Sequence, residues 1–165
     1  MFIYEEIFRD FRKKQIKYVI VGGIALNLLG SLRSTADMDI LVEMSEDNLK
    51  KALSILKKHG YRVKSHIDPM GILDSKTRQE WIKKKHMQAL NFYKDGKLKE
   101  VDIIIGSPIT FEKAEKTAIK IKSGNIILPV VSVDNLIKMK KRAGRAIDKL
   151  DIEELKKIKA LRKKL

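Results

Sequence analysis

The sequence contains no cysteine, three prolines and a single tryptophan in 165 residues. The absence of cysteine excludes disulfide bonds and thiolate metal sites, and it is compatible with a reducing compartment. Long hydrophobic runs are also missing, because the longest mostly apolar stretch, 18–29, is short and includes two glycines and Asn27. The first residues lack the basic start and apolar stretch of a signal peptide. We therefore expect a cytoplasmic protein without membrane attachment.

Positive charge is abundant, since 36 Lys and Arg face 21 Asp and Glu and give a formal net charge of +15. Such a field attracts polyanions, so RNA, nucleotides or an acidic protein are candidate partners. A lysine-rich surface also suits a heat-stable protein, and net charge alone separates these interpretations poorly. Length and a hydrophobic content of 44% predict one folded domain over 1–165.

The stretch 18–42 combines two apolar runs with glycines and acids. Residues 18–21 are apolar and end at Gly22-Gly23, and a second apolar run, 40–42, follows Asp37 and Asp39. This pattern predicts a strand, a glycine turn, a short helix, a loop and a second strand. Glycine lets the backbone approach a ligand closely, and free N–H groups at the start of a helix attract phosphate.

Asp37 and Asp39 are two residues apart at the start of the second predicted strand. Because strand side chains alternate between faces, the two carboxylates share a face, roughly 7 Å apart at the backbone. Converging carboxylates repel each other unless a cation lies between them. We expect Mg²⁺ (or Mn²⁺), because Mg²⁺ prefers a few hard oxygen ligands and completes its shell with waters and substrate phosphates. The alternative is a pair of solvated acids at a strand end.

Gly22-Gly23, thirteen intervening residues (24–36) and an Asp-x-Asp flanked by apolar residues resemble the signature of the DNA polymerase β-like nucleotidyltransferase superfamily. The stretch 33–39 is similar to the Arg-x-Thr-x-Asp-x-Asp form of its minimal members, which include toxin-like nucleotidyltransferases of toxin–antitoxin systems. The resemblance implies that Gly22, Gly23, Arg33 and Thr35 contact a nucleoside triphosphate (NTP) such as ATP. One departure is Gly23, where many active relatives carry serine, so one hydroxyl contact to phosphate is missing.

A third acid, Asp102, lies in an apolar stretch that is predicted to be a strand. Residues 88–93 and 98–105 flank Asp95-Gly96 and predict a β-hairpin. An acid within Val-Asp-Ile-Ile-Ile is costly to bury unless something compensates it. In the family that the sequence resembles, a third carboxylate from a later strand joins the Asp-x-Asp pair. The resemblance implies that Asp102 ligates the metal and helps to deprotonate the attacking hydroxyl; the alternative is a solvated edge acid.

The C-terminal part, about 133–165, is predicted to be helical, with apolar residues at helical spacing. Its lysine-rich segment followed by Arg-x-x-Asp and another acid is similar to the C-terminal segment of the same nucleotidyltransferases. Lys138 and Arg145 are then candidates to neutralise phosphate. The alternative is a solvated basic helix with Asp148 and Asp151 near a helix start, where acids are favourable without any ligand.

Residues 2–15 are predicted to form a helix with Ile3 on its apolar face. A further helix is predicted to start at the cap Ser45 and to end at Gly60, and 119–131 to form a second hairpin. Residues 66–86 are harder to assign, and 77–84 within them is either a short helix or part of a mobile loop over a site. Trp81, in this stretch, is either a core anchor, which we favour, or a surface on which a base stacks.

These patterns together predict an α/β (α+β) fold with a mixed, mainly antiparallel sheet, helices on one side, and Asp37, Asp39 and Asp102 at one edge. The expected activity is metal-dependent transfer of a nucleoside monophosphate (NMP) from an NTP to an acceptor hydroxyl. The acceptor is left open between RNA such as tRNA, a protein and a small molecule, and an antitoxin is a candidate partner. The alternative is a catalytically silent fold of this type that binds nucleic acid or a partner protein.

Overall fold

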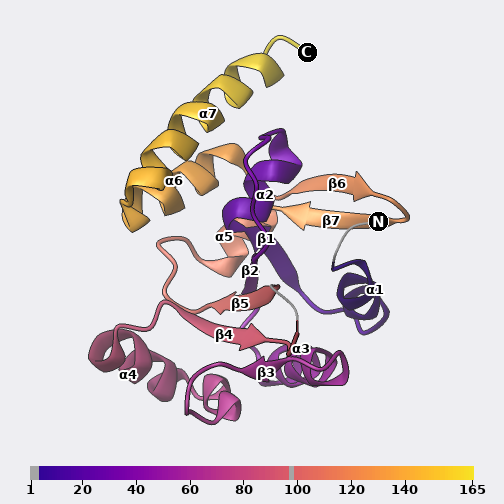
Figure 1. The fold of residues 1–165 in the computed structure, drawn as a ribbon, viewed down its shortest axis with the longest axis vertical. Helices are drawn as coiled ribbons and strands as arrows, with labels where there is room; N and C mark the ends of the chain where they lie inside the picture. Colours follow the sequence, from indigo (N-terminus) through magenta and orange to yellow (C-terminus); the bar gives the residue numbers. More distant parts are fainter. Residues whose placement is uncertain (1–3, 97–98) are drawn as a thin grey trace.

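The structure of the chain is a computed structural model that describes residues 4–96 and 99–165 (Figure 1). Its strands form one sheet in the order β3-β4-β5-β2-β1-β7-β6. The strands are β1 (Tyr18–Val21), β2 (Met38–Val42), β3 (Arg62–Val63), β4 (Ala89–Tyr93), β5 (Glu100–Ile104), β6 (Ile119–Ser123) and β7 (Ile126–Val130).

The sheet is mixed and mainly antiparallel, as predicted. Antiparallel pairs join β1 to β2, β3 to β4, β4 to β5 and β6 to β7, whereas β1 pairs in parallel with β7 and β2 with β5. Both predicted hairpins are confirmed, except that Leu98 lies outside the described residues. The strands that carry Asp39 and Asp102 are interior strands. The expectation of an acid cluster at an edge of the sheet is therefore wrong, because β2 and β5 bond to each other and each to a further neighbour.

The helices follow the predicted segments closely. They are α1 (Glu5–Lys13), α2 (Gly22–Leu29), α3 (Glu46–Lys58), α4 (Ser75–Lys85), α5 (Phe111–Lys116), α6 (Val133–Ala143), α7 (Ala146–Arg162) and the short 3₁₀ helix η1 (Pro69–Leu73). Ser45 caps α3 as predicted, and Ile3 lies outside the described residues. The ambiguous stretch 66–86 forms η1 and α4, and Trp81 is buried, as the core interpretation requires.

The hydrophobic core reaches both faces of the sheet at its centre. All four residues of β1 are buried, and successive strand residues point to opposite faces. On one of these faces the Tyr18 ring stacks on Phe8 of α1, with 5.0 Å between ring centroids. Cover on one side alone would leave alternate residues of β1 exposed, so the expectation that helices lie on one side of the sheet does not hold.

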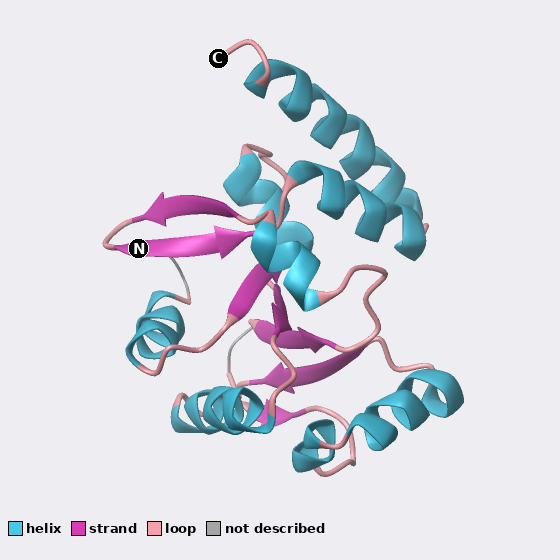
Figure 2. Cartoon of the chain, turned by 180° about the vertical axis from the view of Figure 1, so that it is seen from behind, coloured by secondary structure: helices cyan, strands magenta, loops and turns pink. Residues whose placement is uncertain are grey.

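The last two helices, α6 and α7, pack against each other at one end of the molecule, far from α3 and α4 in both views (Figures 1 and 2). Ser132 caps the start of α6, and Gly144 adopts the left-handed conformation with φ +64° at its end. This glycine stop places the α6–α7 turn beside the end of β1. Among the described residues, none of the helices has the length and apolarity that a bilayer span needs.

A buried asparagine ties α3 to the central strands. The Asn48 side chain donates to the carbonyls of Lys17 (3.0 Å) and Glu43 (2.8 Å) and accepts from the Lys17 N–H (2.9 Å). Lys17 precedes β1 and Glu43 follows β2, so one amide satisfies three backbone groups at adjacent strand ends. A buried amide of this kind stabilises the fold because it satisfies the Lys17 N–H and the Glu43 carbonyl, whereas the Lys17 carbonyl also accepts from the Glu43 N–H at 3.1 Å.

We predict that Asn48→Ala lowers the free energy of unfolding by about 1–3 kcal/mol, since it removes the side-chain partner of the Lys17 N–H and of the Glu43 carbonyl. The exposed Ser54 of the same helix supplies the control, because Ser54→Ala removes a hydroxyl without a buried partner. Urea denaturation followed by circular dichroism measures both. Equal midpoints for the two variants would contradict the assigned role of Asn48.

Candidate active site

The turn from β1 into α2 presses the backbone against Asp39. Gly22 has φ +66°, and a Cβ at this position would lie 1.9 Å from Asp39 Oδ2. Glycine is therefore required twice, for the left-handed conformation and for the space. The Gly23 N–H donates to the Asp39 carboxylate. The start of α2 thus points free N–H groups toward the acid, as expected for an anion-binding helix start.

Asp39 and Asp102 lie directly opposite each other in the parallel pairing of β2 with β5. Register partners on neighbouring strands share a face and are about 5 Å apart at the backbone. Asp37 is exposed and lies one residue before β2. Asn91 of β4 donates to Asp102 Oδ1 at 2.9 Å and holds this carboxylate in place.

Electrostatics follow from this crowding. Burial, and then repulsion by Asp102 and Asp37, raises the pKa of Asp39 to about 7, against the attraction of Lys140. Burial also raises the pKa of Asp102, although the hydrogen bond from Asn91 opposes the rise. The carboxylates therefore sit where negative charge is poorly solvated, which is the condition that a bound cation relieves.

The described residues hold no group of three or more His, Cys, Asp or Glu side chains that could bind a metal ion by themselves. The structure brings Asp39 and Asp102 together as a pair and leaves Asp37 exposed beside them. One or two carboxylates still suffice for Mg²⁺, which fills its shell with waters and substrate phosphates. The donor set therefore fits a cation that arrives with a phosphorylated ligand.

The buried Tyr4 connects the two chain segments that carry the acids. The Tyr4 hydroxyl contacts the Ala36 carbonyl and the Glu100 carbonyl, the latter at 3.0 Å. Ala36 precedes Asp37, and Glu100 lies two residues before Asp102, so this contact fixes the separation of the two chain segments that carry the acids.

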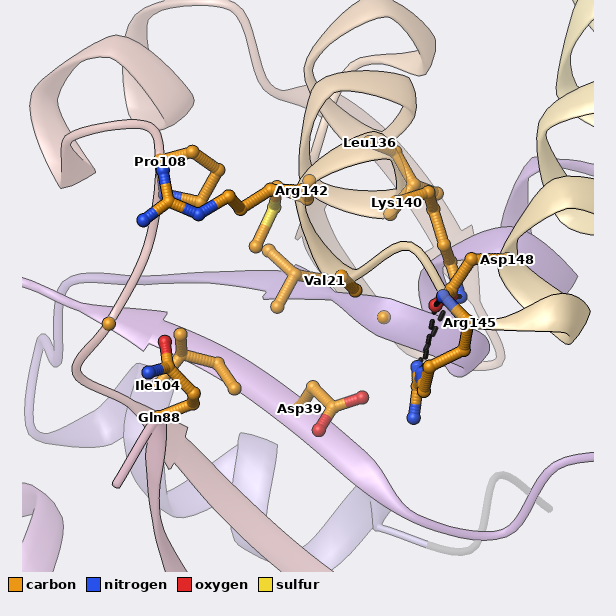
Figure 3. A pocket seen from close by; sticks show the side chains of 14 residues that line it. Val21, Asp39, Gln88, Ile104, Pro108, Leu136, Lys140, Arg142, Arg145 and Asp148 are labelled. Atoms are coloured by element: carbon orange, nitrogen blue, oxygen red, sulfur yellow. Dashed lines mark hydrogen bonds and ion pairs between the residues drawn. The ribbon is translucent and has the colours of Figure 1, made fainter. Parts of the chain in front are cut away.

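A pocket of about 560 Å³ opens above Asp39. Its floor comes from β1, β2 and β5, and α6 with the turn into α7 forms the opposite wall (Figure 3). Figure 3 shows Arg145 and Asp148 on one side of Asp39 and Gln88 and Ile104 on the other. The volume lies within the range typical of small-molecule sites.

The pocket wall contains a fully buried ion network. Lys140 Nζ lies 2.7 Å from Asp151 Oδ2 and 3.2 Å from Asp148 Oδ1, and all three residues are buried. Arg145 Nε donates to Asp148 Oδ2 at 2.8 Å, and its backbone N–H reaches the same oxygen at 3.1 Å. Burial raises the pKa of Asp148, but the hydrogen bonds from Arg145 and Lys140 outweigh it and hold that pKa below its ordinary value.

This network also reaches the loop that precedes Asp37. Arg33 Nε lies 3.2 Å from Asp151 Oδ1, an ion pair without hydrogen-bond alignment. Ser31 Oγ donates to Glu154 Oε2 of α7 at 2.8 Å. The C-terminal helices therefore hold the loop between α2 and β2 in place.

The space above Gly23 is filled by the predicted phosphate-contacting residues themselves. A Cβ on Gly23 would lie 2.7 Å from Thr35 Oγ1 and 3.0 Å from a terminal guanidinium nitrogen of Arg33. The departure at this position thus has a local explanation, because the hydroxyl of Thr35 stands where a serine side chain at position 23 would have to go.

Sequence reasoning selected Lys138 and overlooked Lys140. Lys138 is exposed and lies off the pocket, whereas Lys140 is buried in its wall. A signal was present, because Lys140 continues the apolar stripe of Val133 and Leu136 at helical spacing. Asp148 lies in the first turn of α7, as the alternative placed it, and both Asp148 and Asp151 are buried. Gln88, also overlooked, carries no pattern that marks it.

We predict that metal-free protein loses stability relative to Asp39→Asn as pH rises from about 4 to about 7. The raised pKa means that folded Asp39 keeps its proton in this range while the unfolded chain releases it, so stability present at low pH is lost. The expected difference is on the order of 3 kcal/mol. Urea denaturation with chelator across this range measures it, with the exposed Asp47→Asn as control. Parallel curves for wild type and Asp39→Asn would refute the assignment.

We predict that Gly23→Ser lowers the free energy of unfolding by about 1–3 kcal/mol, because the new side chain overlaps Thr35. In a Thr35→Ala background the same change should cost less than half as much. Thermal or urea denaturation of the double-mutant cycle gives the coupling. Additive effects would mean that Thr35 does not occupy this space.

Comparisons with known proteins agree with this geometry. Residues 1–118 match a protein-family model described as an uncharacterised nucleotidyltransferase. No curated protein sequence matches the chain. The fold is similar to that of the lincosamide antibiotic adenylyltransferase LnuA bound to lincomycin, with a TM-score of 0.58 and 18% identity over 93% of this chain and 94% of that one.

The fold is also similar to that of ANT(2″)-Ia in complex with adenylyl-2″-tobramycin, with a TM-score of 0.60, 14% identity and coverage of 97% of this chain and 92% of that one. At such identities the likeness establishes the fold. The family match spans more than half of the chain and contains the glycine turn, Asp37, Asp39 and Asp102. The chain therefore belongs to this nucleotidyltransferase family.

Proposed function

We propose that the chain transfers an NMP from an NTP to an acceptor hydroxyl at Asp37, Asp39 and Asp102, in a metal-dependent reaction. The observation that supports this most is the register of Asp39 opposite Asp102 beside a helix start that begins with glycine. Asp39, whose pKa is raised, lines the pocket together with Gly22, and Asp102, whose pKa is also raised, lies opposite Asp39 on the next strand. Such a combination serves phosphoryl chemistry better than a structural role.

Mg²⁺ or Mn²⁺ is the proposed cofactor, held by Asp39 and Asp102 with Asp37 beside them. When bound, the ion would neutralise charge on the triphosphate and polarise the phosphorus that is attacked. The carboxylate donors suit these hard cations. The crowding of two acids on adjacent strands, against which Lys140 and Arg145 attract Asp39 from the opposite wall, supports this assignment.

The chain's own groups would bind the donor from two sides. The N–H groups at Gly22 and Gly23 would donate hydrogen bonds to phosphate oxygens. Arg33 and Thr35 lie close to the same turn. Lys140 and Arg145 supply positive charge from the opposite wall, which offsets the charge that accumulates on the phosphates. Lys138, being exposed and off the pocket, is the weakest of the candidate nucleotide contacts.

Asp102 is the proposed base. Its carboxylate would accept the proton of the acceptor hydroxyl, whose oxygen forms the new bond to the α-phosphorus while the bond to pyrophosphate breaks. A carboxyl with a raised pKa is a stronger proton acceptor than a solvated one, which suits this role. Asn91 would keep it oriented toward the pocket.

The donor and the acceptor each have candidates from different observations. Adenylyl transfer in the structural neighbours makes ATP the first donor to test. Those neighbours bind antibiotics, so a small-molecule acceptor is one candidate, and the net charge of +15 makes RNA another. A toxin-like role with an antitoxin partner rests on the Arg-x-Thr-x-Asp-x-Asp stretch alone.

We predict that one NTP, with ATP the first candidate, binds only in the presence of Mg²⁺ and that Asp39→Asn weakens this binding at least about tenfold, because the ion loses a ligand. Calorimetry with each of the four NTPs, with and without Mg²⁺, measures this without knowledge of the acceptor. Asp47→Asn, an exposed change on α3, is the matched control. Absence of binding by folded wild type would favour the silent fold that only binds a partner.

A further inference from the structure

Positive charge is concentrated in the two C-terminal helices. Residues 133–165 contain twelve Lys and Arg against five Asp and Glu, a net +7 of the whole chain's +15. One fifth of the chain therefore carries almost half of the net charge. This segment also supplies one wall of the pocket, so the charge is concentrated next to the proposed site.

The five acids of this segment are all engaged internally. Asp148 and Asp151 are buried with Lys140, Asp134 pairs with Lys159, Glu153 pairs with Lys156, and Glu154 accepts from Ser31. Among the described residues, six cationic side chains of the segment are exposed and form no side-chain hydrogen bond or ion pair: Lys141, Arg142, Lys149, Lys157, Lys163 and Lys164. The surface thus presents uncompensated positive charge.

Five lysines of α7 and of the residues that directly follow it recur on one side of the helix, whereas Lys159 pairs with Asp134. Lys149, Lys156, Lys157, Lys163 and Lys164 are separated by seven, eight, fourteen and fifteen residues from the first, spacings that return to the same side of an α-helix. We call these five residues the α7 lysine face. The buried residues of α7, which include Asp148, Asp151 and Leu155, lie on a different side of the helix, and α7 packs against α6.

The α7 lysine face begins beside the pocket and continues away from it. Arg145 precedes the first residue of α7 and lines the pocket, as does Arg142 at the end of α6. From there α7 runs outward for 17 residues, about 25 Å, to the C-terminus (Figure 1). A line of positive charge therefore leads from the surface to the pocket mouth.

We propose that the α7 lysine face binds the phosphate backbone of a single-stranded nucleic acid whose terminal hydroxyl is the acceptor, which rests on the proposed function. Lysines recognise phosphates as point charges and need no fixed geometry. Arg142, at the pocket mouth, would receive the phosphate nearest the acceptor hydroxyl. A pocket of about 560 Å³ admits a terminal nucleotide beside the donor more readily than the end of a duplex.

An anionic membrane or an acidic protein would meet the same charges. Interfacial helices anchor through aromatic residues on an apolar face, and α7 contains none. The α7 lysine face begins beside the proposed nucleotide pocket. This arrangement favours a partner that also enters the pocket, as the end of a nucleic acid would.

The test compares two triple variants that remove the same charge. Lys149→Ala, Lys157→Ala and Lys164→Ala alter the α7 lysine face, whereas Lys13→Ala, Lys83→Ala and Lys120→Ala remove three exposed lysines elsewhere. Fluorescence anisotropy with a labelled single-stranded RNA of about 20 nucleotides, at several salt concentrations, measures affinity and its salt dependence. Anionic lipid vesicles and a polyglutamate peptide serve as the other probes.

We expect the first triple variant to lose at least about tenfold in RNA affinity and to flatten the slope of log affinity against log salt by about 2. The control triple should change affinity less than about threefold at the same salt concentration. Equal losses in both would show that net charge alone attracts RNA and would overturn the proposal. So would selective loss of vesicle or peptide binding with RNA binding unchanged, or absence of RNA binding by wild type.

The donor site provides a separate readout. NTP binding with Mg²⁺ should be unchanged in the first triple variant, and Asp39→Asn should lose NTP binding while it keeps RNA binding. In a transfer assay the triple variant should raise the KM for RNA and leave the KM for NTP unchanged. If RNA binding depends on the α7 lysine face but no NTP binds, the proposed function and the acceptor role fail together, and only a nucleic-acid-binding surface remains.

Discussion

Repulsion between the carboxylates of Asp39 and Asp102 is the constraint that the site is arranged around. The parallel register of β2 with β5 places them opposite each other, and a sheet offers no way to separate register partners without a slip of the whole strand. Such a slip would expose the apolar residues of β2, all of which are buried. The core therefore enforces an electrostatically costly pairing, and the cost is relieved when a cation or a proton arrives.

The cost is also limited by the C-terminal helices. Lys140 faces Asp39 across the pocket and lowers its pKa against burial, but most of its charge is committed to Asp148 and Asp151. A buried lysine with two carboxylates is stable because each charge has a partner, whereas the loss of one partner would leave a buried charge unpaired. Lys140 therefore attracts Asp39 from across the pocket, while its ion pairs with Asp148 and Asp151 keep its ammonium group in the opposite wall.

The division of labour along the chain follows from this arrangement. Residues 1–118, which match the family model, contain the glycine turn and the three acids, while the opposite wall of the pocket comes from 136–148. Arg33 and Ser31 connect the two parts through Asp151 and Glu154. A segment beyond the family match therefore completes the pocket and carries +7 of the chain's net charge of +15.

The local features of the site were predictable from sequence. The glycine turn, the short helix and the acid pair at a strand start each arise from residues close in the chain, where φ preferences and strand alternation act. The two hairpins and the start of α6 were also predictable. Asp95-Gly96 and Gly124-Asn125 determine the turns locally, and Ser132 caps α6. Residues 97 and 98, within the first hairpin, lie outside the described part of the chain.

Tertiary structure decided the rest. Interior positions for β2 and β5 depend on strand order, which no local pattern specifies, and β1 is covered both by the neighbouring helix α1 and by α5, which is distant in sequence. Lys138 and Lys140 look alike in a run of basic residues. Helical spacing favours Lys140 as the buried one, and Asp148 and Asp151 make its burial possible, because a lysine leaves water only where carboxylates compensate its charge.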